Sequence, residues 1–441
     1  MQKVLNKIKK IIPKKVFTFF QPVYHYKMAL LGAIWYRFPS RKIKVVAVTG
    51  TKGKTSTVEF INAILEEAGF ITALAGTLRF KIRDDSKPNM YKMTMPGRFF
   101  IQHFLRQAVN AHCDYAIIEM SSEAAKQYRH KFINLDALVF TNLAPEHIES
   151  HGSYDKYLEA KLSIAHALEK SPKKGKIICA NIDDKEGHKF LAVNIERKAP
   201  YSLKDGEPIV CHDKGVSFVC EEVKIESKLP GKFNVYNMLA AVAYARALGI
   251  SLESIKAGLE KVTEIKGRAQ KIPNDLGIEV LVDYAHTPDS LRALYDAFKE
   301  IPLKDSGSIS PEHKLICVLG NCGGGRDKWK RKEMAEIANQ YCDQIILTDE
   351  DPYDDDPREI TEEMAKYTDK EKTEIIMDRR EAIAKSLHKA LTLRQAQGDK
   401  NMVILVTGKG TDPYIMRANG VKEPWSDATI VEEELSKVRI T

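Results

Sequence analysis

The residues with the strongest chemical signature follow a short apolar segment near the start of the chain. Val45–Val48 is predicted to be a buried strand, and a glycine-rich run separates it from a predicted helix over 55–68. Glycines let backbone N–H groups approach phosphate oxygens, and a helix N-terminus adds a favourable partial charge. The pattern predicts a nucleotide-phosphate loop, in which Lys54 reaches the β- and γ-phosphates and Thr55 offers its hydroxyl to Mg²⁺. The residues predicted to contact the nucleotide are Gly50, Thr51, Lys52, Gly53, Lys54, Thr55 and Ser56.

Polar residues near the ends of later strands could complete such a site. Glu119 ends the predicted strand Tyr115–Glu119, and a carboxylate at that sheet edge, beside a phosphate loop, is well placed for Mg²⁺. His147 follows the next predicted strand, Ala137–Thr141, and Lys161 lies on the helix after it. Taken alone, each of these three side chains is more often a solvated residue.

Asn234 and Asn237 lie one helical turn apart and share a face of a predicted helix over 234–248. They could contact a nucleotide base, or Asn234 could instead cap the helix.

Composition limits the class of protein. The chain has 441 residues, enough for about two to four domains. Its hydrophobic share of 44% and charged share of 29% are ordinary for a globular protein and exclude a collagen-like or wholly disordered chain. Seven cysteines, an odd number without a C-x-x-C pair, argue against a disulfide framework or a structural zinc site. A reducing cytoplasm is the expected location.

The positive charge is concentrated at the N-terminus. Residues 1–44 hold eleven Lys and Arg and no Asp or Glu, so residues 45–441 hold 68 − 11 = 57 basic and 60 acidic residues, a net of −3. Nucleic-acid binding by residues 45–441 is therefore disfavoured.

The N-terminal segment itself has two interpretations. Apolar residues recur at helical spacing among lysines, at Val4, Ile8, Ile11 and Ile12. Prolines at 13, 22 and 39 are expected to interrupt the segment. The segment could be a solvated helix packed on the body, or it could contact an anionic membrane surface or a protein partner. The apolar run Met28–Ile34 is too short to span a bilayer.

The remaining elements alternate between strand and helix, which is typical of a mostly parallel sheet covered by helices. Predicted strands are 45–48, 115–119, 137–141, 176–180, 279–283, 314–319, 343–348, 373–377 and 402–407. Predicted helices are 55–68, 98–111, 153–169, 234–248, 251–261, 288–299, 328–340, 358–367, 379–391 and 428–436. Residues 199–230 are predicted to form short β pieces, and 303–312 and 393–400 to form polar loops.

In order along the chain, from about residue 30 to the C-terminus, these motifs resemble the Mur ligase family. Its branch of UDP-N-acetylmuramoyl-tripeptide synthetases is the most similar. Thr49–Thr57 resembles the family's phosphate loop, and the string Val282–Leu291, V-D-Y-A-H-T-P-D-S-L, is the most discriminating match. Mur ligases are ATP-dependent enzymes of peptidoglycan biosynthesis that join an amino acid to a carboxylate of a cell-wall precursor.

The resemblance implies an α/β fold in three parts. These are a basic N-terminal extension over 1–44, a central P-loop domain with a mostly parallel sheet over 45–267, and a C-terminal Rossmann-like domain over 268–441. It also implies ATP and two Mg²⁺ as cofactors, with a cell-wall peptide precursor and a free amino acid as partners.

The resemblance further implies individual roles in the first half. Glu119 would bind one Mg²⁺ together with Thr55. His147, within a string similar to T-N-L-x-x-D-H-L-D-x-H-G, would bind the second. Lys161 would be carbamylated by CO₂ and help hold that second metal. The residues expected to meet the acceptor substrate are Thr94, Ser121, Ser122, Gln127 and Arg129.

In the second half, Arg268, Asp283 and His286 are implied to face ATP, with Asn234 and Asn237 near the adenine. Catalytic roles are implied for Lys54, Lys161, His147 and Arg268. The further predicted substrate contacts are Arg326, Asp351, Pro352, Tyr353, Gly408, Lys409 and Asp412.

The identity of the added amino acid is expected to depend on residues 348–357. Family members that add meso-diaminopimelate typically show D-N-P-R there, and the Arg holds the distal carboxylate. In this chain Tyr353 replaces that Arg. A tyrosine hydroxyl cannot form the bidentate charged pair of a guanidinium, so diaminopimelate is disfavoured. The acidic run on both sides of Tyr353 could instead favour a cationic side chain such as Lys or ornithine, or could be a solvated loop.

Members of the family usually carry a larger N-terminal domain that grips the uridine nucleotide, whereas only about 44 residues precede the phosphate loop here. How the acceptor is held is therefore open. The alternatives are the same ligase chemistry on a lipid-linked, non-UDP or folate-like acceptor, or a non-catalytic ATP-binding scaffold.

Overall fold

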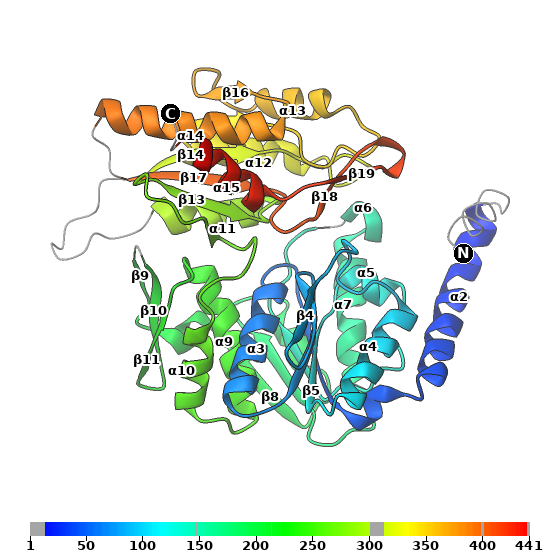
Figure 1. Ribbon diagram of the computed structural model, residues 1–441. Helices are drawn as coiled ribbons and strands as arrows, with labels where there is room; N and C mark the ends of the chain where they lie inside the picture. Colours follow the sequence, from blue (N-terminus) through cyan, green and yellow to red (C-terminus); the bar gives the residue numbers. More distant parts are fainter. Residues whose placement is uncertain (1–13, 147, 213, 300–312, 398–400, 439–441) are drawn as a thin grey trace. The chain divides into compact units, whose positions relative to one another are not determined.

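The computed structural model describes residues 14–146, 148–212, 214–299, 313–397 and 401–438 (Figure 1). The chain divides into two compact units. Unit 1 comprises residues up to 143 together with 155–201 and 240–255, and unit 2 comprises 144–154, 202–239 and 256–441. The predicted boundaries at 44/45 and 267/268 stay predictions.

Unit 1 is built on an eight-stranded sheet with the order β4-β3-β2-β5-β1-β6-β7-β8. The β2–β3 and β3–β4 pairs are antiparallel and the other pairs are parallel. The strands are β1 (Lys44–Thr49), β2 (Thr72–Ala75), β3 (Arg79–Ile82), β4 (Asp85–Pro88), β5 (Tyr115–Glu119), β6 (Ala137–Phe140), β7 (Ile177–Asn181) and β8 (Arg197–Tyr201).

The central strands of this sheet are buried on both faces. Every residue from Val45 to Val48 in β1 is 0% exposed, as are the residues Ala116–Ile118 of β5. A continuous apolar run is expected where helices cover both sides of a parallel sheet. The helical segments of this part of the chain are α2 (Lys14–Trp35), η1 (Pro39–Lys42), α3 (Lys54–Glu67), α4 (Arg98–Asn110), α5 (Ser122–Lys126), α7 (Tyr154–Glu169) and α8 (Gly187–Leu191).

Helix α2 lies beside α4 at the edge of unit 1 (Figure 1). The prediction that Pro22 interrupts this segment was wrong, because α2 continues through Pro22. The predicted periodic residues Val4, Ile8, Ile11 and Ile12 lie outside the described residues.

Unit 2 is built on a six-stranded sheet with the order β12-β13-β17-β14-β15-β16, in which only the β12–β13 pair is antiparallel. Its strands are β12 (Gln270–Lys271), β13 (Glu279–Asp283), β14 (Lys314–Leu319), β15 (Gln344–Leu347), β16 (Thr373–Ile375) and β17 (Met402–Thr407). Two antiparallel sheets accompany it, formed by β9 (Val210–His212), β10 (Gly215–Cys220) and β11 (Val223–Ser227), and by β18 (Tyr414–Met416) and β19 (Lys422–Pro424).

Helices cover both faces of the six-stranded sheet. One face packs alternate strand residues, such as Leu315 and Cys317, against α11, α12 and α13. The other face packs the intervening residues, such as Ile316 and Val318, against α14 and α15. The helices are α11 (Pro288–Lys299), α12 (Lys330–Tyr341), α13 (Pro357–Ala365), α14 (Arg379–Gln397) and α15 (Asp427–Val438). The other helical segments of the chain are α6 (Ile148–His151), α9 (Lys232–Ala247), α10 (Leu252–Lys261), η2 (Leu203–Gly206) and η3 (Ala418–Gly420).

The observed architecture confirms the predicted α/β class with two mostly parallel sheets. All nine predicted strands and all ten predicted helices are present, with ends that differ by a few residues. The predicted loop over 393–400 was wrong as far as Gln397, because α14 continues through it on good helix-forming residues. The predicted loop over 303–312 lies outside the described residues.

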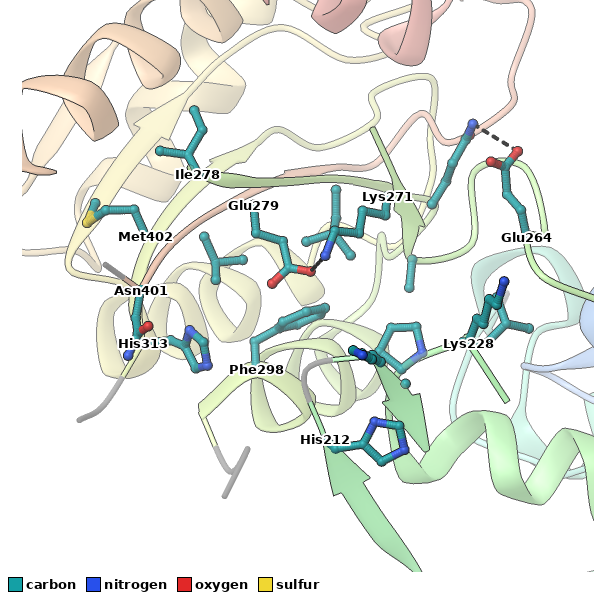
Figure 2. A pocket seen from close by; sticks show the side chains of 18 of the residues that line it. His212, Lys228, Glu264, Lys271, Ile278, Glu279, Phe298, His313, Asn401 and Met402 are labelled. Atoms are coloured by element: carbon teal, nitrogen blue, oxygen red, sulfur yellow. Dashed lines mark hydrogen bonds and ion pairs between the residues drawn. The ribbon is translucent and has the colours of Figure 1, made fainter. Parts of the chain in front are cut away.

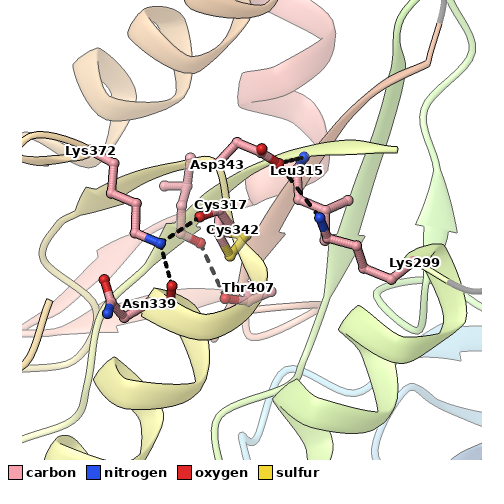
Figure 3. The surroundings of a disulfide bond; sticks show 9 residues. Lys299, Leu315, Cys317, Asn339, Cys342, Asp343, Lys372 and Thr407 are labelled. Atoms are coloured by element: carbon pink, nitrogen blue, oxygen red, sulfur yellow. Dashed lines mark hydrogen bonds and ion pairs between the residues drawn. A yellow bond between two sulfur atoms is a disulfide. The ribbon is translucent and has the colours of Figure 1, made fainter. Parts of the chain in front are cut away.

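One disulfide joins Cys317 in β14 to Cys342, directly after α12, in the face covered by α11 to α13 (Figure 3). Their Cα atoms are 6.1 Å apart and both side chains are buried. The sequence analysis, which argued against a disulfide framework, did not predict this bridge. The spacing of 25 residues between the two cysteines did not predict a disulfide, because they meet only through the pairing of parallel strands β14 and β15.

Among the described residues, every helix is too short or too polar to cross a lipid bilayer.

A buried ion pair fastens α14 to α15, and we expect its loss to destabilise unit 2. Arg379 donates two hydrogen bonds of 2.8 Å to Asp427, and both side chains are almost wholly buried. Arg379→Met leaves a buried carboxylate without its cation, which should cost about 3–5 kcal/mol in the free energy of unfolding. Urea denaturation measures this loss. The matched control is Arg380→Met, whose pairs with Glu433 and Glu434 are partly exposed and should cost about 1 kcal/mol or less. Equal losses in the two variants would contradict the assignment.

Candidate nucleotide and substrate sites

The predicted phosphate loop, called the phosphate loop below, joins β1 to α3 and is held by the residues that follow β6. Thr141 Oγ1 donates to the carbonyl of Lys52 at 2.6 Å, and the Asn142 side chain accepts from the Lys52 N–H at 2.8 Å. Gly50 has a φ of +152°, and a Cβ at this position would lie 1.9 Å from Thr141 Oγ1. Gly53, with a φ of +80°, is the N-cap of α3. The loop therefore needs glycine at position 50 for both its backbone conformation and this close approach.

Two lysines converge on the backbone of the loop. Lys54, the first residue of α3, donates from Nζ to the carbonyls of Gly50 and Thr51 at 3.0 and 2.8 Å. Lys161 on α7 is 1% exposed and donates to the same Gly50 carbonyl at 2.6 Å. Tyr157, one turn earlier on α7, places its hydroxyl 2.9 Å from Thr51 Oγ1. Residues predicted from two separate motifs are thus brought together, and Tyr157 joins them as a contact that the sequence analysis did not single out.

Thr55 and Glu119 also meet beside the loop. Thr55 Oγ1 donates to the two Glu119 carboxylate oxygens at 3.3 and 3.2 Å, and Glu119, the last residue of β5, is 1% exposed. The Thr77 N–H donates to Glu119 at 2.9 Å, and the Thr77 hydroxyl lies 3.0 Å from that of Thr94. Ser56 is buried in the first turn of α3. A hydroxyl and a carboxylate are oxygen ligands of the kind that Mg²⁺ takes, so this pair fits the predicted metal role. No pattern in the sequence marked Thr77.

The predicted second metal site is less complete. His147 lies outside the described residues, so its role stays a prediction. Among the residues that the structure describes, no group of three or more His, Cys, Asp and Glu side chains could hold a metal ion. Glu149, two residues beyond His147, has its N–H 3.3 Å from the Asp327 carboxylate, within unit 2.

Four of the five residues predicted to contact the acceptor substrate follow β5 in the chain, and the fifth, Thr94, precedes α4. Ser121 is the N-cap of α5 and accepts a backbone N–H at 3.2 Å, while Ser122 is buried. Arg129 donates to the Gln127 side chain at 2.8 Å and to the carbonyl of Met95, next to the predicted contact at position 94. Burial lowers the pKa of the Arg129 guanidinium. The four predicted residues therefore lie on one short stretch of chain, with Arg129 tying it to the 94–95 segment.

In unit 2, Asp283 holds the turn that carries Arg268. Its carboxylate accepts the N–H groups of Ala269 and Ala285 at 2.5 and 2.6 Å. The Arg268 guanidinium carbon lies 4.5 Å from the centre of the Tyr284 ring. Asp283 thus positions Arg268 through the backbone, a role that the sequence analysis did not anticipate.

His286 has its own set of partners in unit 2. Its Nδ1 lies 2.7 Å from the carbonyl of Tyr284, and its Nε2 lies 3.1 Å from Glu146. Lys330 donates from Nζ to the His286 carbonyl at 3.0 Å. Two predicted motifs, around 146 and 286, are therefore in contact.

Asn234 and Asn237 are buried neighbours on α9. The Asn237 side chain donates to that of Asn234 at 3.4 Å, and Asn234 donates to the carbonyl of Pro230 at 2.8 Å. The predicted capping alternative for Asn234 was wrong, because α9 begins at Lys232 and Asn234 lies inside it.

The predicted amino-acid site lies where β14, β15 and β17 end. Carboxyl ends of neighbouring parallel strands are the usual place for a ligand. Lys409 donates to Asp351 at 2.8 Å, and both side chains are almost fully buried. Asp412 lies 3.7 Å from the same ammonium group. The predicted residues Asp351, Lys409 and Asp412 therefore form one buried network, and Asp351 is neutralised by a cation of the protein itself.

Glu350 is a buried carboxylate that the sequence analysis did not include among the site residues. Its Oε1 accepts from the Cys322 thiol at 3.1 Å, and its Oε2 is buried with no hydrogen-bond partner in the described part of the chain. Gly408, with a φ of +105°, would place a Cβ 2.4 Å from that oxygen. Burial raises the pKa of Glu350, and burial together with Glu350 raises the pKa of Cys322 to about 12. The only sequence signal was the position of Glu350 in the acidic run.

Arg326 and Tyr353 form a pair at the edge of this cluster. The guanidinium donates to the Tyr353 hydroxyl at 2.8 Å and lies 5.3 Å from the ring centre. Burial opposes the charge of Arg326, but Cys322 and Tyr353 outweigh it and raise its pKa. Pro352 is in close contact with the glycine-rich turn, since a Cβ on Gly323 would lie 2.2 Å from its carbonyl oxygen. A guanidinium is therefore present beside Tyr353, although the sequence places it 27 residues away.

A cavity of about 560 Å³ lies elsewhere in unit 2 (Figure 2). Ile278, Phe298 and Met402 contribute apolar walls, and Lys271 pairs with Glu279 at 2.7 Å. None of the predicted site residues lines it. Its lining residues adjoin, along the chain, positions 213, 300–312 and 398–400, which lie outside the described residues, so we assign it no ligand.

Comparisons with known proteins give consistent matches. Residues 48–245 match a family model described as the Mur ligase middle domain, and residues 267–410 match one described as the Mur ligase, glutamate ligase domain. The chain is 36% identical over 423 residues to a UDP-N-acetylmuramoyl-L-alanyl-D-glutamate–2,6-diaminopimelate ligase of Syntrophomonas wolfei, covering 92% of this chain and 81% of that protein.

Solved structures agree in fold. A structure of a UDP-N-acetylmuramoyl-L-alanyl-D-glutamate–2,6-diaminopimelate ligase matches with a TM-score of 0.59 and 28% identity, covering 90% of this chain and 79% of that one. Folylpolyglutamate synthase of Mycobacterium tuberculosis, complexed with ADP, matches with a TM-score of 0.68, covering 87% and 91%. Its identity of 16% supports likeness of fold alone.

The contact between Gly50 and Thr141 predicts a large effect of a single methyl group. Gly50→Ala should abolish measurable ADP binding in calorimetry and lower the thermal unfolding midpoint, because the new Cβ would collide with Thr141 Oγ1. Gly69→Ala is the control. Gly69 has a φ of +84°, but no atom lies within 4 Å of the position that a methyl group would take there, so only a backbone cost of about 1 kcal/mol is expected. Normal ADP binding by Gly50→Ala would refute this view of the loop.

Proposed function

The chain belongs to the Mur ligase family, and from this membership we propose that it adds one amino acid to UDP-N-acetylmuramoyl-L-alanyl-D-glutamate. As a Mur ligase it is an ATP-dependent acid–amino-acid ligase of peptidoglycan biosynthesis. The observation that carries the proposed acceptor is the match over 92% of the chain to a ligase named for that substrate. We place the reaction in the cytoplasm, in a central domain over 45–267 and a C-terminal domain over 268–441.

We propose that the loop from Gly50 to Ser56 holds the phosphates of ATP. Its backbone N–H groups and the N-terminus of α3 would bind phosphate oxygens. Lys54, at the start of α3, would move from the loop carbonyls to the terminal phosphates. Thr55 and Glu119 would hold Mg²⁺, which neutralises phosphate charge when bound.

The proposed reaction has two steps. The acceptor carboxylate attacks the γ-phosphorus, so an O–P bond forms, the bond to ADP breaks, and an acyl phosphate results. The amine of the amino acid then attacks the acyl carbon, releases phosphate and loses a proton to give the amide. The protein contributes positioning and charge neutralisation, for which we assign Arg129, Arg268 and His286 as contacts.

For the amino acid, we propose a side chain with a free distal amine and no distal carboxylate, such as Lys or ornithine. Tyr353 occupies the position of the arginine that diaminopimelate ligases use, and its hydroxyl already accepts from Arg326. Asp351 is paired with Lys409, so Glu350, with its unused Oε2, is the carboxylate best suited to an incoming ammonium group. The relatives named above add 2,6-diaminopimelate, which makes that amino acid the competing outcome of the test.

Phosphate release tests the proposed function. The full chain with ATP, Mg²⁺ and UDP-N-acetylmuramoyl-L-alanyl-D-glutamate should release phosphate only when an amino acid is added, and Lys or ornithine should exceed meso-diaminopimelate in kcat/KM by about tenfold or more, because one charged pair is missing for the latter. A preference for diaminopimelate would overturn the amino-acid assignment alone. Absence of release with every amino acid, from protein that still binds ATP, would overturn the acceptor and favour a lipid-linked, non-UDP or folate-like acceptor or a scaffold.

We also propose that Lys161 acts after carbamylation by CO₂, as a carboxylate-like ligand of a second Mg²⁺ shared with His147. The support is the complete burial of Lys161 against the phosphate loop, where a plain surface charge would not be found.

Lys161→Ala should then lower kcat by about a hundredfold. Short-chain carboxylates should restore part of the rate, because they can occupy the space of the missing carbamate. Lys156→Ala, at an exposed position on the same helix, is the control and should keep the parent rate. Full activity of Lys161→Ala would refute the proposal. If Lys161→Ala loses activity and short-chain carboxylates do not restore it, the carbamate is refuted and the role of Lys161 is limited to its hydrogen bond with the Gly50 carbonyl.

A further inference from the structure

One face of α2 exposes large apolar side chains. Between 45% and 74% of the surface of each remains exposed along a single stripe at positions 20, 23, 24, 31, 34 and 35. These positions recur at intervals of three, four and seven residues, which places them on one side of a helix. The residues are Phe20, Val23, Tyr24, Leu31, Ile34 and Trp35.

The opposite face of α2 carries small residues and packs on the body. Ala29, Gly32 and Ala33 are buried, and a Cβ on Gly32 would lie 3.5 Å from Phe99 of α4. His25 on the same face contacts Arg98 of α4. A helix of a soluble protein normally buries its large apolar residues and exposes its polar ones. In α2 small residues are buried and large apolar residues are exposed, and an exposed apolar stripe of this kind marks an interaction surface.

The segment of the sequence that carries the stripe is basic and has no acidic residue. Lys27 lies on the same face, between Tyr24 and Leu31. Residues 1–44 hold eleven Lys and Arg, and the first acidic residue of the chain is Glu59. Two copies of such a segment would repel each other, which argues against a dimer through this face. An anionic surface would be attracted.

The side-chain types also match a lipid interface. The stripe includes Tyr24 and Trp35, and such amphipathic rings prefer the headgroup level of a bilayer. A helix with apolar residues on one side and Lys nearby binds in the plane of the interface rather than across the membrane. Tyr26 flanks the stripe and contacts the rings of Tyr128 and Phe132, so α2 is packed on the rest of unit 1.

We propose that this exposed face of α2 docks onto the surface of a bilayer that contains anionic lipids, with the apolar stripe inserted at the headgroup boundary. This docking would hold the enzyme at the membrane surface.

Co-sedimentation of the full chain with lipid vesicles tests this proposal. Binding to phosphatidylglycerol-containing vesicles should exceed binding to pure phosphatidylcholine vesicles by about tenfold or more and should weaken as salt rises. The double variant Leu31→Ser/Ile34→Ser should lose about tenfold or more in apparent affinity, because apolar area no longer enters the interface. Lys27→Glu should weaken binding by about tenfold or more through the reversed charge.

The matched control is Val421→Ser in unit 2, which removes a side chain that is as exposed as Ile34 but lies far from it in sequence. It should bind vesicles like the parent protein, and thermal unfolding should confirm that every variant is folded. Parent protein that stays in solution with both kinds of vesicle would overturn the proposal. Equal binding of the α2 variants, or self-association in sedimentation that the α2 variants abolish, would also overturn it.

Discussion

The contact between the phosphate loop and the residues that follow β6 is the constraint on which the arrangement of unit 1 depends. Thr141 and Asn142 fasten the loop at Lys52, and the fit is so close that Gly50 has no room for a side chain. With the loop held there, Lys161 can reach the Gly50 carbonyl from α7. The parallel pairing of β5, β1 and β6 makes this convergence unavoidable, because it brings the carboxyl ends of three strands to one edge.

In unit 2, too, the carboxyl ends of parallel strands bring charged side chains together. The ends of β14, β15 and β17 meet around a buried Lys409–Asp351 pair, and the nearby Arg379–Asp427 pair ties α14 to α15. In both of these pairs the buried charge has its counter-charge within the fold, which is the condition under which ions are tolerated in an interior. Glu350 departs from this pattern, since one of its buried oxygens has no partner among the described residues. Under the proposed function, this oxygen is available for the ammonium group of the incoming amino acid.

The α2 helix combines two properties, since it packs closely on α4 and exposes an apolar face. Small residues such as Ala29 and Gly32 let the helix approach α4 closely, while the larger apolar residues face outward. The result is a firmly attached helix whose exposed side has the chemistry of a membrane-surface anchor.

The amino-acid sequence alone determined the α/β class, the order of nearly all strands and helices, the phosphate loop and the family, because these depend on local periodicity and on contiguous motifs. It did not reveal the short strands β2 to β4, whose few residues lack a distinct pattern, or the run of α14 through 393–397. Only the tertiary structure decided that Thr77 contacts Glu119, that Arg326 accompanies Tyr353 and that Asp351 is neutralised by Lys409. The physical reason is that these contacts join residues 27 to 58 positions apart, and the pairing of strands and packing of helices, rather than spacing along the chain, sets which side chains meet.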